Sequence, residues 1–242
     1  MTIPSNEQTL VLIKPDALKL SLTGYVLSQL SEFHTGLRFA AAKIVHVTNM
    51  LAEEHYAEHK GKFFFPSLIE YIMGAIHYPD AVHKRRVIAL VYSGPAAVSK
   101  VREIAGPTNP HVARERAPGT IRALGTVVPV KDDSGAVIGE RMDNLVHGSA
   151  NAVDAQREVK LWFKPCDVMP HMRTYATAVC EEHYYLTGGA LTTRRESGSV
   201  SVLAPGDIAW QSDLEALSAL TLGQPAACTL DAVVAKYLIN RE

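Results

Sequence analysis

The chain has 242 residues, of which 47% are hydrophobic and 20% charged, with a formal net charge of −1. This composition is typical of one large globular domain, or one domain with a smaller appendage, and it lacks the basic excess of a nucleic-acid-binding protein. No apolar run is long enough for a membrane span, the polar start does not resemble a signal peptide, and the three cysteines are far apart. We therefore expect a cytoplasmic protein with reduced thiols.

The first part of the chain alternates strand and helix patterns. The β-branched run at residues 9–13 predicts a buried strand that stops at Lys14 and Pro15. Apolar residues at helical spacing over 23–33 predict a helix, which Gly36 can end in the left-handed conformation. The patterns that follow predict a strand over 38–47, a helix over 50–60, a short helix over 67–75 and a surface loop over 76–86.

The middle of the chain repeats this order. Residues 86–92 predict a third strand, a helix carrying Arg102 follows, and a long loop runs over 106–122. Residues 121–130 predict a fourth strand, followed by a turn at 131–135. The resulting β-α-β-β-α-β order predicts an α+β fold, a ferredoxin-like α/β sandwich with a four-stranded antiparallel sheet and helices on one face.

The last quarter of the chain changes character after Pro165. Strand patterns flank Gly188 and Gly189, which is a hairpin signal, and residues 200–203 predict another short strand. A capping box at residues 212–215 and an amphipathic run near Val233 predict two helices. We therefore divide the chain into a main domain over 1–165 and a small α+β extension over 166–242.

The stretch NLVHGS at residues 144–149 places an imidazole, His147, just before a predicted helix. Asn151 can cap that helix, and Glu158 lies on its second turn, where its carboxylate could fold back towards the imidazole. A carboxylate on one ring nitrogen fixes the histidine tautomer and leaves the other nitrogen free to act as a nucleophile. His147 is therefore a candidate catalytic residue, although taken alone it could be an ordinary loop histidine.

A second histidine pattern suggests a different chemistry. His55, Glu58 and His59 have the H-x-x-E-H spacing of one class of zinc peptidase. Two histidines four residues apart share a face of a continuous helix and can ligate zinc together. No third ligand is evident in the sequence, so a solvated helix face is the favoured interpretation.

Several motifs together resemble those of the nucleoside diphosphate kinase family. In chain order they are LIKPD at 12–16, HY at 55–56, FFP at 64–66, GPTNP at 106–110, PGTIR at 118–122, NLVHGS at 144–149 and EVKLWF at 158–163. They span about residues 8–165. The resemblance implies transfer of the γ-phosphate of a nucleoside triphosphate to a nucleoside diphosphate through a phosphohistidine. It implies that His147 is the nucleophile and that Glu158 orients it.

The same resemblance implies roles for other residues. Those that hold the phosphates and the sugar are expected to be Lys14, Tyr56, Arg102, Thr108, Arg122 and Asn144, with Lys14, Tyr56 and Asn144 also acting in catalysis. Phe64 and Leu68 are expected to form the platform for the base, where no pair of side chains is evident that could read a base edge. Mg²⁺ would be held mainly by the nucleotide phosphates, with no metal ligand from the protein, and the protein is expected to be a homo-oligomer.

The expected residue types suit phosphoryl transfer, which depends on positioning and charge neutralisation more than on covalent work by the protein. The chain also departs from the family pattern. It has Ala150 where Asp is common after His-Gly-Ser, Leu20 and Ser21 where Arg-Gly is common, and insertions near 76–86, 111–117 and 131–141. These departures and the long extension leave an alternative open, a nucleotide-binding regulatory or scaffold protein with reduced or no turnover.

Overall fold

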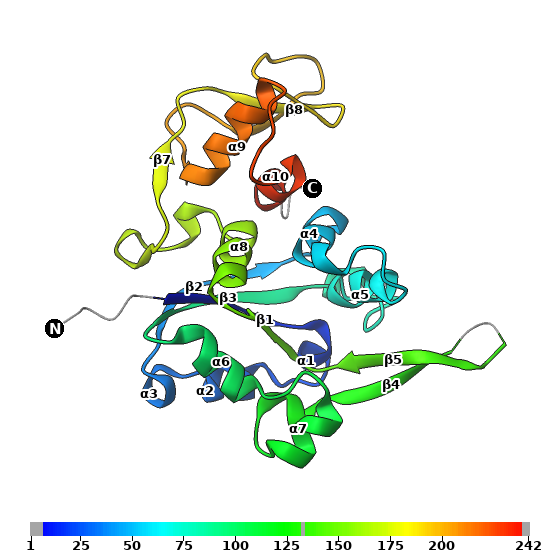
Figure 1. Cartoon of the computed structure of the whole chain (residues 1–242). Helices are drawn as coiled ribbons and strands as arrows, with labels where there is room; N and C mark the ends of the chain where they lie inside the picture. The colour runs from blue at the N-terminus through cyan, green and yellow to red at the C-terminus, as the bar shows by residue number, and fades with distance from the viewer. Residues whose placement is uncertain (1–6, 132–133, 239–242) are drawn as a thin grey trace.

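The computed structural model describes residues 7–131 and 134–238 (Figure 1). At its centre is a four-stranded sheet in the order β2-β3-β1-β6, in which every neighbouring pair is antiparallel. The strands are β1 (Glu7–Ile13), β2 (Arg38–Val45), β3 (Val87–Gly94) and β6 (Val146–Gly148). This arrangement confirms the ferredoxin-like sheet that was predicted.

The fourth strand of this sheet is not residues 121–130, and that prediction is wrong. Residues Ile121–Leu124 form a 3-10 helix, η3, while β4 (Thr126–Lys131) pairs with β5 (Val137–Asp143) in a separate hairpin. The position beside β1 is taken by β6, in which His147 lies opposite Leu12. A three-residue strand is too short to leave an alternating pattern, whereas Pro129 can lie in β4 because that strand belongs to a two-stranded edge. The predicted turn includes residues 132 and 133, which lie outside the described residues.

One face of the sheet packs against the two crossover segments. These contain α1 (Pro15–Lys19), α2 (Thr23–Gln29), α3 (Glu32–Thr35) and α6 (Ala97–Ala105). Val11 and Ile13 of β1 pack there with Val26 and Val101. The helix predicted over 23–33 is therefore two helices, although Gly36 ends the second with φ 65° as expected.

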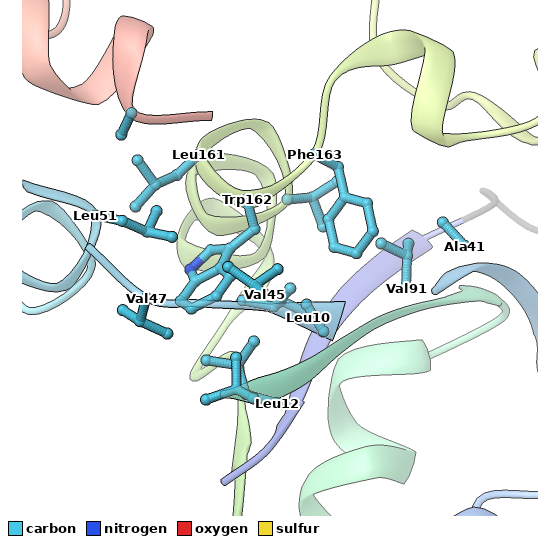
Figure 2. Close-up of a cluster of buried hydrophobic side chains, with 14 of the residues drawn as sticks. Leu10, Leu12, Ala41, Val45, Val47, Leu51, Val91, Leu161, Trp162 and Phe163 are labelled. Atoms are coloured by element: carbon cyan, nitrogen blue, oxygen red, sulfur yellow. The ribbon is translucent and has the colours of Figure 1, made fainter. Parts of the chain in front are cut away.

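The opposite face of the sheet is also covered, so the prediction of helices on one face is wrong. Leu10 and Leu12 of β1 pack beneath α4 (Asn49–His55), α5 (Phe65–Ile72) and α8 (Ala152–Trp162). Trp162 and Phe163, at the end of α8, fill the centre of this second core (Figure 2). Because successive residues of β1 point to opposite faces and both are buried, the strand shows no polar alternation.

Three further short helices occupy the connections. They are η1 (Ala57–His59), η2 (Val82–Lys84) and α7 (Pro110–Arg116). The stretch 106–122 is thus not one long loop: the Asn109 side chain accepts a hydrogen bond from the His111 amide and caps α7, whose first residue is Pro110.

The extension after residue 165 packs directly on α4 and α8 (Figure 1). Its elements are η4 (Pro165–Asp167), η5 (Pro170–Met172), β7 (Thr177–Val179), β8 (Tyr184–Thr187), β9 (Ala190–Thr192), β10 (Val200–Leu203), β11 (Ile208–Trp210), α9 (Gln211–Thr221) and α10 (Leu230–Leu238). The β8–β9 hairpin at Gly188 and Gly189 is confirmed. The capping box is not formed, because α9 begins at Gln211 and the Ser212 hydroxyl accepts a hydrogen bond from Lys160 Nζ at 3.1 Å.

Two contacts join the extension to the main core. The indole of Trp210 donates a 2.7 Å hydrogen bond to the carbonyl of Phe163, and Ala235 of α10 belongs to the core cluster above the sheet. Across the described part of the chain, no helix has both the length and the apolar character needed to cross a membrane.

Candidate active site

His147 lies on β6, directly after a sharp turn in the backbone. Leu145 has φ 69°, and the amide of Val146 donates a 2.7 Å hydrogen bond to the carbonyl of Asn144, which closes a three-residue turn. The carboxylate of Asp16 accepts a 2.8 Å hydrogen bond from the Leu145 amide, and the Leu145 carbonyl accepts one of 2.9 Å from the Lys14 amide. Lys14 and Asp16, which follow β1, therefore hold Leu145 in a left-handed conformation that is unfavourable for leucine, and with it the position of His147.

Helix α8 brings the carboxylate of Glu158 to the imidazole, as the sequence predicted. The Asn151 side chain caps this helix by accepting a hydrogen bond from the Asp154 amide at 2.9 Å. One turn further along, Glu158 Oε2 lies 2.9 Å from His147 Nε2 and also accepts a 2.6 Å hydrogen bond from the Ser149 hydroxyl. Since the Ser149 oxygen in turn accepts one from the Leu10 amide, the carboxylate is held by the sheet as well as by the helix.

The contact with Glu158 decides which ring nitrogen of His147 carries the proton. Burial alone would raise the pKa of Glu158, but attraction to His147, followed by their hydrogen bond, holds it at about 2. The carboxylate is therefore ionised at neutral pH and can only accept hydrogen bonds. The proton of neutral His147 consequently lies on Nε2, and the lone pair is on Nδ1.

A second histidine supports the first from behind. The His55 ring is buried and meets the His147 ring edge-on, with centroids 4.5 Å apart. The Trp162 indole donates a 3.2 Å hydrogen bond to His55 Nδ1, and burial together with the charge of His147 lowers the His55 pKa well below its ordinary value. His55 is therefore neutral at pH 7, and its ring limits the movement of His147.

Cationic side chains converge on the same place from other elements. Lys14 is buried, its Nζ donates to Asn144 Oδ1, and it lies 4.5 Å from the centroid of the Tyr71 ring. Burial lowers the pKa of Lys14 to about 8. Asn144 is fixed in turn by a 2.8 Å hydrogen bond from its amide to the carbonyl of Thr108.

The guanidinium of Arg122 is held by the backbone. It donates to the carbonyl of Val146 at 3.1 and 3.3 Å and to that of Gly106 at 2.9 Å. Burial first, and then the charge of Arg102, lower the pKa of Arg122 to about 10. Two positive charges near one another in a pocket form a site suited to a polyanion such as a phosphate chain.

All ten site residues that the sequence predicted line one pocket of about 480 Å³. Its remaining walls include residues that the sequence did not single out for this purpose, namely His55, Tyr71 and six residues of the β4–β5 hairpin. His59 also lines it, although the sequence suggested this residue only as a zinc ligand. The sequence shows part of this hairpin only as an insertion near 131–141. No motif in that insertion predicts that it forms a wall of the pocket.

The structure does not support the zinc pairing of His55 with His59. Helix α4 ends at His55, so the two histidines do not share a continuous helix face, and His59 Nδ1 lies 2.9 Å from Lys62 Nζ. Among the described residues, the group with metal-ligating atoms close together is His55, His147 and Glu158, all within 4.8 Å. These ligands are rich in nitrogen, whereas Mg²⁺ prefers oxygen, so they do not form a magnesium site.

The fold and the pocket together fit the class of phosphoryl-transfer enzymes, which bind polyanions and position a nucleophile against them. The family model for nucleoside diphosphate kinase matches residues 7–168. Relatives named nucleoside diphosphate kinase include one from Mycobacterium marinum, 42% identical over 157 residues that cover 65% of this chain and 96% of the relative. Another, from Pyrococcus furiosus, is 38% identical and covers 69% of this chain and 89% of its own length.

Solved structures give the same result. The Aquifex aeolicus nucleoside diphosphate kinase superposes with a TM-score of 0.54 at 30% identity, over 68% of this chain and 99% of that one. A halophilic nucleoside diphosphate kinase from Halobacterium salinarum, in complex with CDP, gives 0.51 at 31% identity, over 68% and 91%. The chain belongs to the nucleoside diphosphate kinase family and is a phosphotransferase with that activity.

Proposed function

We propose that the reaction proceeds in two half-reactions through a phosphohistidine on His147. In the first, Nδ1 attacks the γ-phosphorus of a nucleoside triphosphate, the bond to the β-γ bridging oxygen breaks, and the nucleoside diphosphate leaves. In the second, a β-phosphate oxygen of another diphosphate attacks the same phosphorus and the N–P bond breaks. The observation that supports this proposal is the 2.9 Å contact of His147 Nε2 with Glu158, which leaves Nδ1 unprotonated.

The charged residues of the pocket would neutralise the phosphate chain. We assign Lys14, Arg102 and Arg122 to the phosphates, and Asn144 and Thr108 to the sugar and phosphate region. Tyr56 adjoins them at the end of α4, and burial raises the pKa of Tyr56 above its ordinary value. Its hydroxyl therefore remains protonated and can donate a hydrogen bond to a phosphate oxygen.

The apolar side of the pocket would hold the base, with Phe64 and Leu68 as its platform. Mg²⁺ is the divalent cation that we propose, held mainly by the phosphate oxygens and supplying charge neutralisation there. The carboxylates that line the pocket support a metal held by the phosphates and not by the protein. Glu158 is engaged by His147 and Ser149, and Glu58 and Glu140 are exposed.

We also propose that the kinase domain comprises residues 1–165 and that residues 166–242 form a C-terminal extension. The partners of the protein would be nucleoside di- and triphosphates and further copies of the same chain, with no nucleic acid and no membrane. The protein would act in the cytoplasm. Exposed apolar side chains on the edge strand β2, Phe39 and Ile44, support association between copies.

Intact-mass spectrometry after mixing the protein with ATP and magnesium tests the mechanism. We expect the mass of one phosphoryl group per chain, removed on adding a nucleoside diphosphate and absent in His147→Ala. Labelling that persists in this variant would refute the assignment of the nucleophile. A wild-type protein that binds nucleotides but gains no phosphoryl group would favour the regulatory or scaffold alternative.

A further inference from the structure

Lys14, which we assign to the phosphates, is a buried cation with few partners. Burial lowers the pKa of Lys14 to about 8. Among the described residues, its Nζ contacts the side-chain oxygen of Asn144 and the face of the Tyr71 ring. Asp16 and Asp143 act on it only through their charge. Because burial disfavours the charged form of an amine, the groups in contact with Nζ decide whether it keeps its proton.

Helix α5 places the Tyr71 ring against this ammonium. Nζ lies 4.5 Å from the ring centroid, and the ring is buried. That separation is within the roughly 6 Å of a cation–π contact. Ile69 and Ile72 anchor α5 in the core above the sheet, and the His77 ring packs against Tyr71 with centroids 5.2 Å apart. The position of the ring is therefore set by the fold around it.

The end of α5 is also held close to the residue that follows Lys14. Gly74 lies two residues after the end of the helix and has φ 82°. A Cβ atom added there would lie 3.2 Å from Cα of Arg85 and 3.5 Å from Cγ of Pro15. Glycine adopts this conformation without strain and lets the chain pass this near to Pro15. Lys14 and Tyr71 therefore come from segments that pack directly on each other.

The charged and titratable groups that face Lys14 are Asp16, His55, Tyr71, Arg122 and Asp143. Burial raises the pKa of Tyr71 well above its ordinary value and lowers that of His55 well below, so both are neutral between about pH 6.5 and 9. Arg122, whose pKa burial lowers to about 10, and Asp143, with a pKa of about 2 despite burial, remain mostly charged over that range. A pH-dependent change in nucleotide binding that disappears with the amine therefore belongs to Lys14.

We infer that Tyr71 is a positioning residue for Lys14, and that the face of its ring holds the ammonium at the phosphate end of the pocket in its charged form. The negative face of an aromatic ring attracts a cation, more strongly where water is excluded. The ring also stabilises the charge without a carboxylate in contact, which would compete with the phosphates for the same ammonium. The inference rests on the proposed role of Lys14 in phosphate binding, and deepens it.

The test measures the affinity for ADP as a function of pH by titration calorimetry. Tyr71→Phe keeps the ring and removes the hydroxyl, whereas Tyr71→Leu keeps an apolar side chain and removes the π face. Loss of the cation–π contact should lower the pH at which Lys14 loses its proton by about one unit, from about 8 to about 7. We therefore expect Tyr71→Leu to bind ADP about 5-fold more weakly than the wild type at pH 8 but within about 1.5-fold of it at pH 6.5. Tyr71→Phe should follow the wild type at both.

A defect in packing alone would weaken binding to a similar degree at both pH values and would overturn the inference, as would a Tyr71→Leu profile that matches the wild type. If Tyr71→Leu does not fold, the ring at position 71 is replaced by phenylalanine carrying one, two or three fluorine atoms. These atoms withdraw electrons from the π face and nearly preserve its shape. The pH at which half of the affinity is lost should fall stepwise with the number of fluorine atoms, and a constant value would refute the contact. Tyr185→Leu, in strand β8 of the extension, is the matched control and should leave the profile unchanged.

Lys14→Met separates this inference from the proposed function. We expect this variant to bind ADP weakly, with no further alkaline loss up to about pH 9. Wild-type binding by Lys14→Met would refute the assignment of Lys14 to the phosphates. If Lys14→Met binds weakly but Tyr71→Leu and Tyr71→Phe have the same profile, the role of Tyr71 alone is refuted. Because the measurement needs no turnover, the expected shift in a protein that forms no phosphoenzyme would support the role of Tyr71 and refute the kinase mechanism.

Discussion

Replacing Glu158 by glutamine would remove the negative charge beside His147 while keeping an oxygen that can accept its hydrogen bond. In the proposed mechanism Nδ1 takes up the phosphoryl group and positive charge develops on the imidazole ring, whose Nε2 lies 2.9 Å from Glu158 Oε2. The carboxylate stabilises that charge, and glutamine stabilises it less. The free imidazole loses little, so the substitution should slow the chemical step rather than weaken substrate binding.

The pKa of Glu158 indicates the size of this effect. Its fall from 4.5 to about 2, despite burial, arises mainly from attraction to His147 and their hydrogen bond. At about 1.4 kcal/mol for each pKa unit, this net shift corresponds to about 3 kcal/mol in favour of the ionised carboxylate, which sets the scale of the electrostatic effect. Only part of the full charge develops in the transition state, so we expect kcat for Glu158→Gln to fall about 10- to 100-fold with KM little changed.

Rapid-quench measurement of phosphoenzyme formation from ATP alone isolates the first half-reaction. Glu158→Ala should be slower than Glu158→Gln, because alanine also leaves the Ser149 hydroxyl and the Nε2 proton of His147 without their acceptor. Thermal melts verify that both variants are folded. A Glu158→Gln protein that forms phosphoenzyme within threefold of the wild-type rate would show that the carboxylate contributes no electrostatic stabilisation.

Two further predictions follow from burial. Because burial lowers the pKa of Lys14 to about 8, its charge is lost as the pH rises through that value. We therefore expect kcat/KM to fall above pH 8 in a profile from pH 7 to 10, and Lys14→Arg to extend the plateau to higher pH. An unchanged profile in Lys14→Arg would show that the charge of Lys14 does not cause the fall. Deleting residues 169–242 removes Ala235 and Met172 from the main core and Trp210 from its contact with Phe163. At about 1.5–3 kcal/mol for each large side chain, the loss of these contacts should lower the melting temperature by more than about 10 °C. A truncated protein with the same melting temperature as the full chain would show that the extension does not contribute to the core.

The predictable parts of the site were those with a signal in a few adjacent residues. Asn151 before an apolar stripe indicated where α8 begins, and the helical period then placed Glu158 near His147. The ten predicted residues come from motifs spread over much of the chain, yet they line one pocket. The spacing of these motifs alone does not predict that they converge. That prediction came from the order of the motifs, which resembles that of one family.

The parts that could not be predicted depend on pairings between distant residues. Strand β6 has three residues and is defined by its contacts with Val11, Leu12 and Ile13, which no local pattern reveals. The run over 126–131 has the stronger strand pattern, yet it pairs only with β5. Strand propensity describes a residue's fit to a pleated surface, and it does not say which sheet that surface belongs to.

The extension illustrates how a composition boundary can differ from a boundary in packing. The sequence changes character after Pro165, but the core above the sheet contains Val168, Met172 and Ala235 alongside Leu10 and Trp162. Helix α10 rests on α4, and the Thr229 hydroxyl donates a 2.9 Å hydrogen bond to Glu54 of that helix. His55 and Tyr56, which line the pocket behind His147, follow Glu54 directly. The extension therefore contributes to the core above the sheet and contacts the helix that ends at the wall of the pocket.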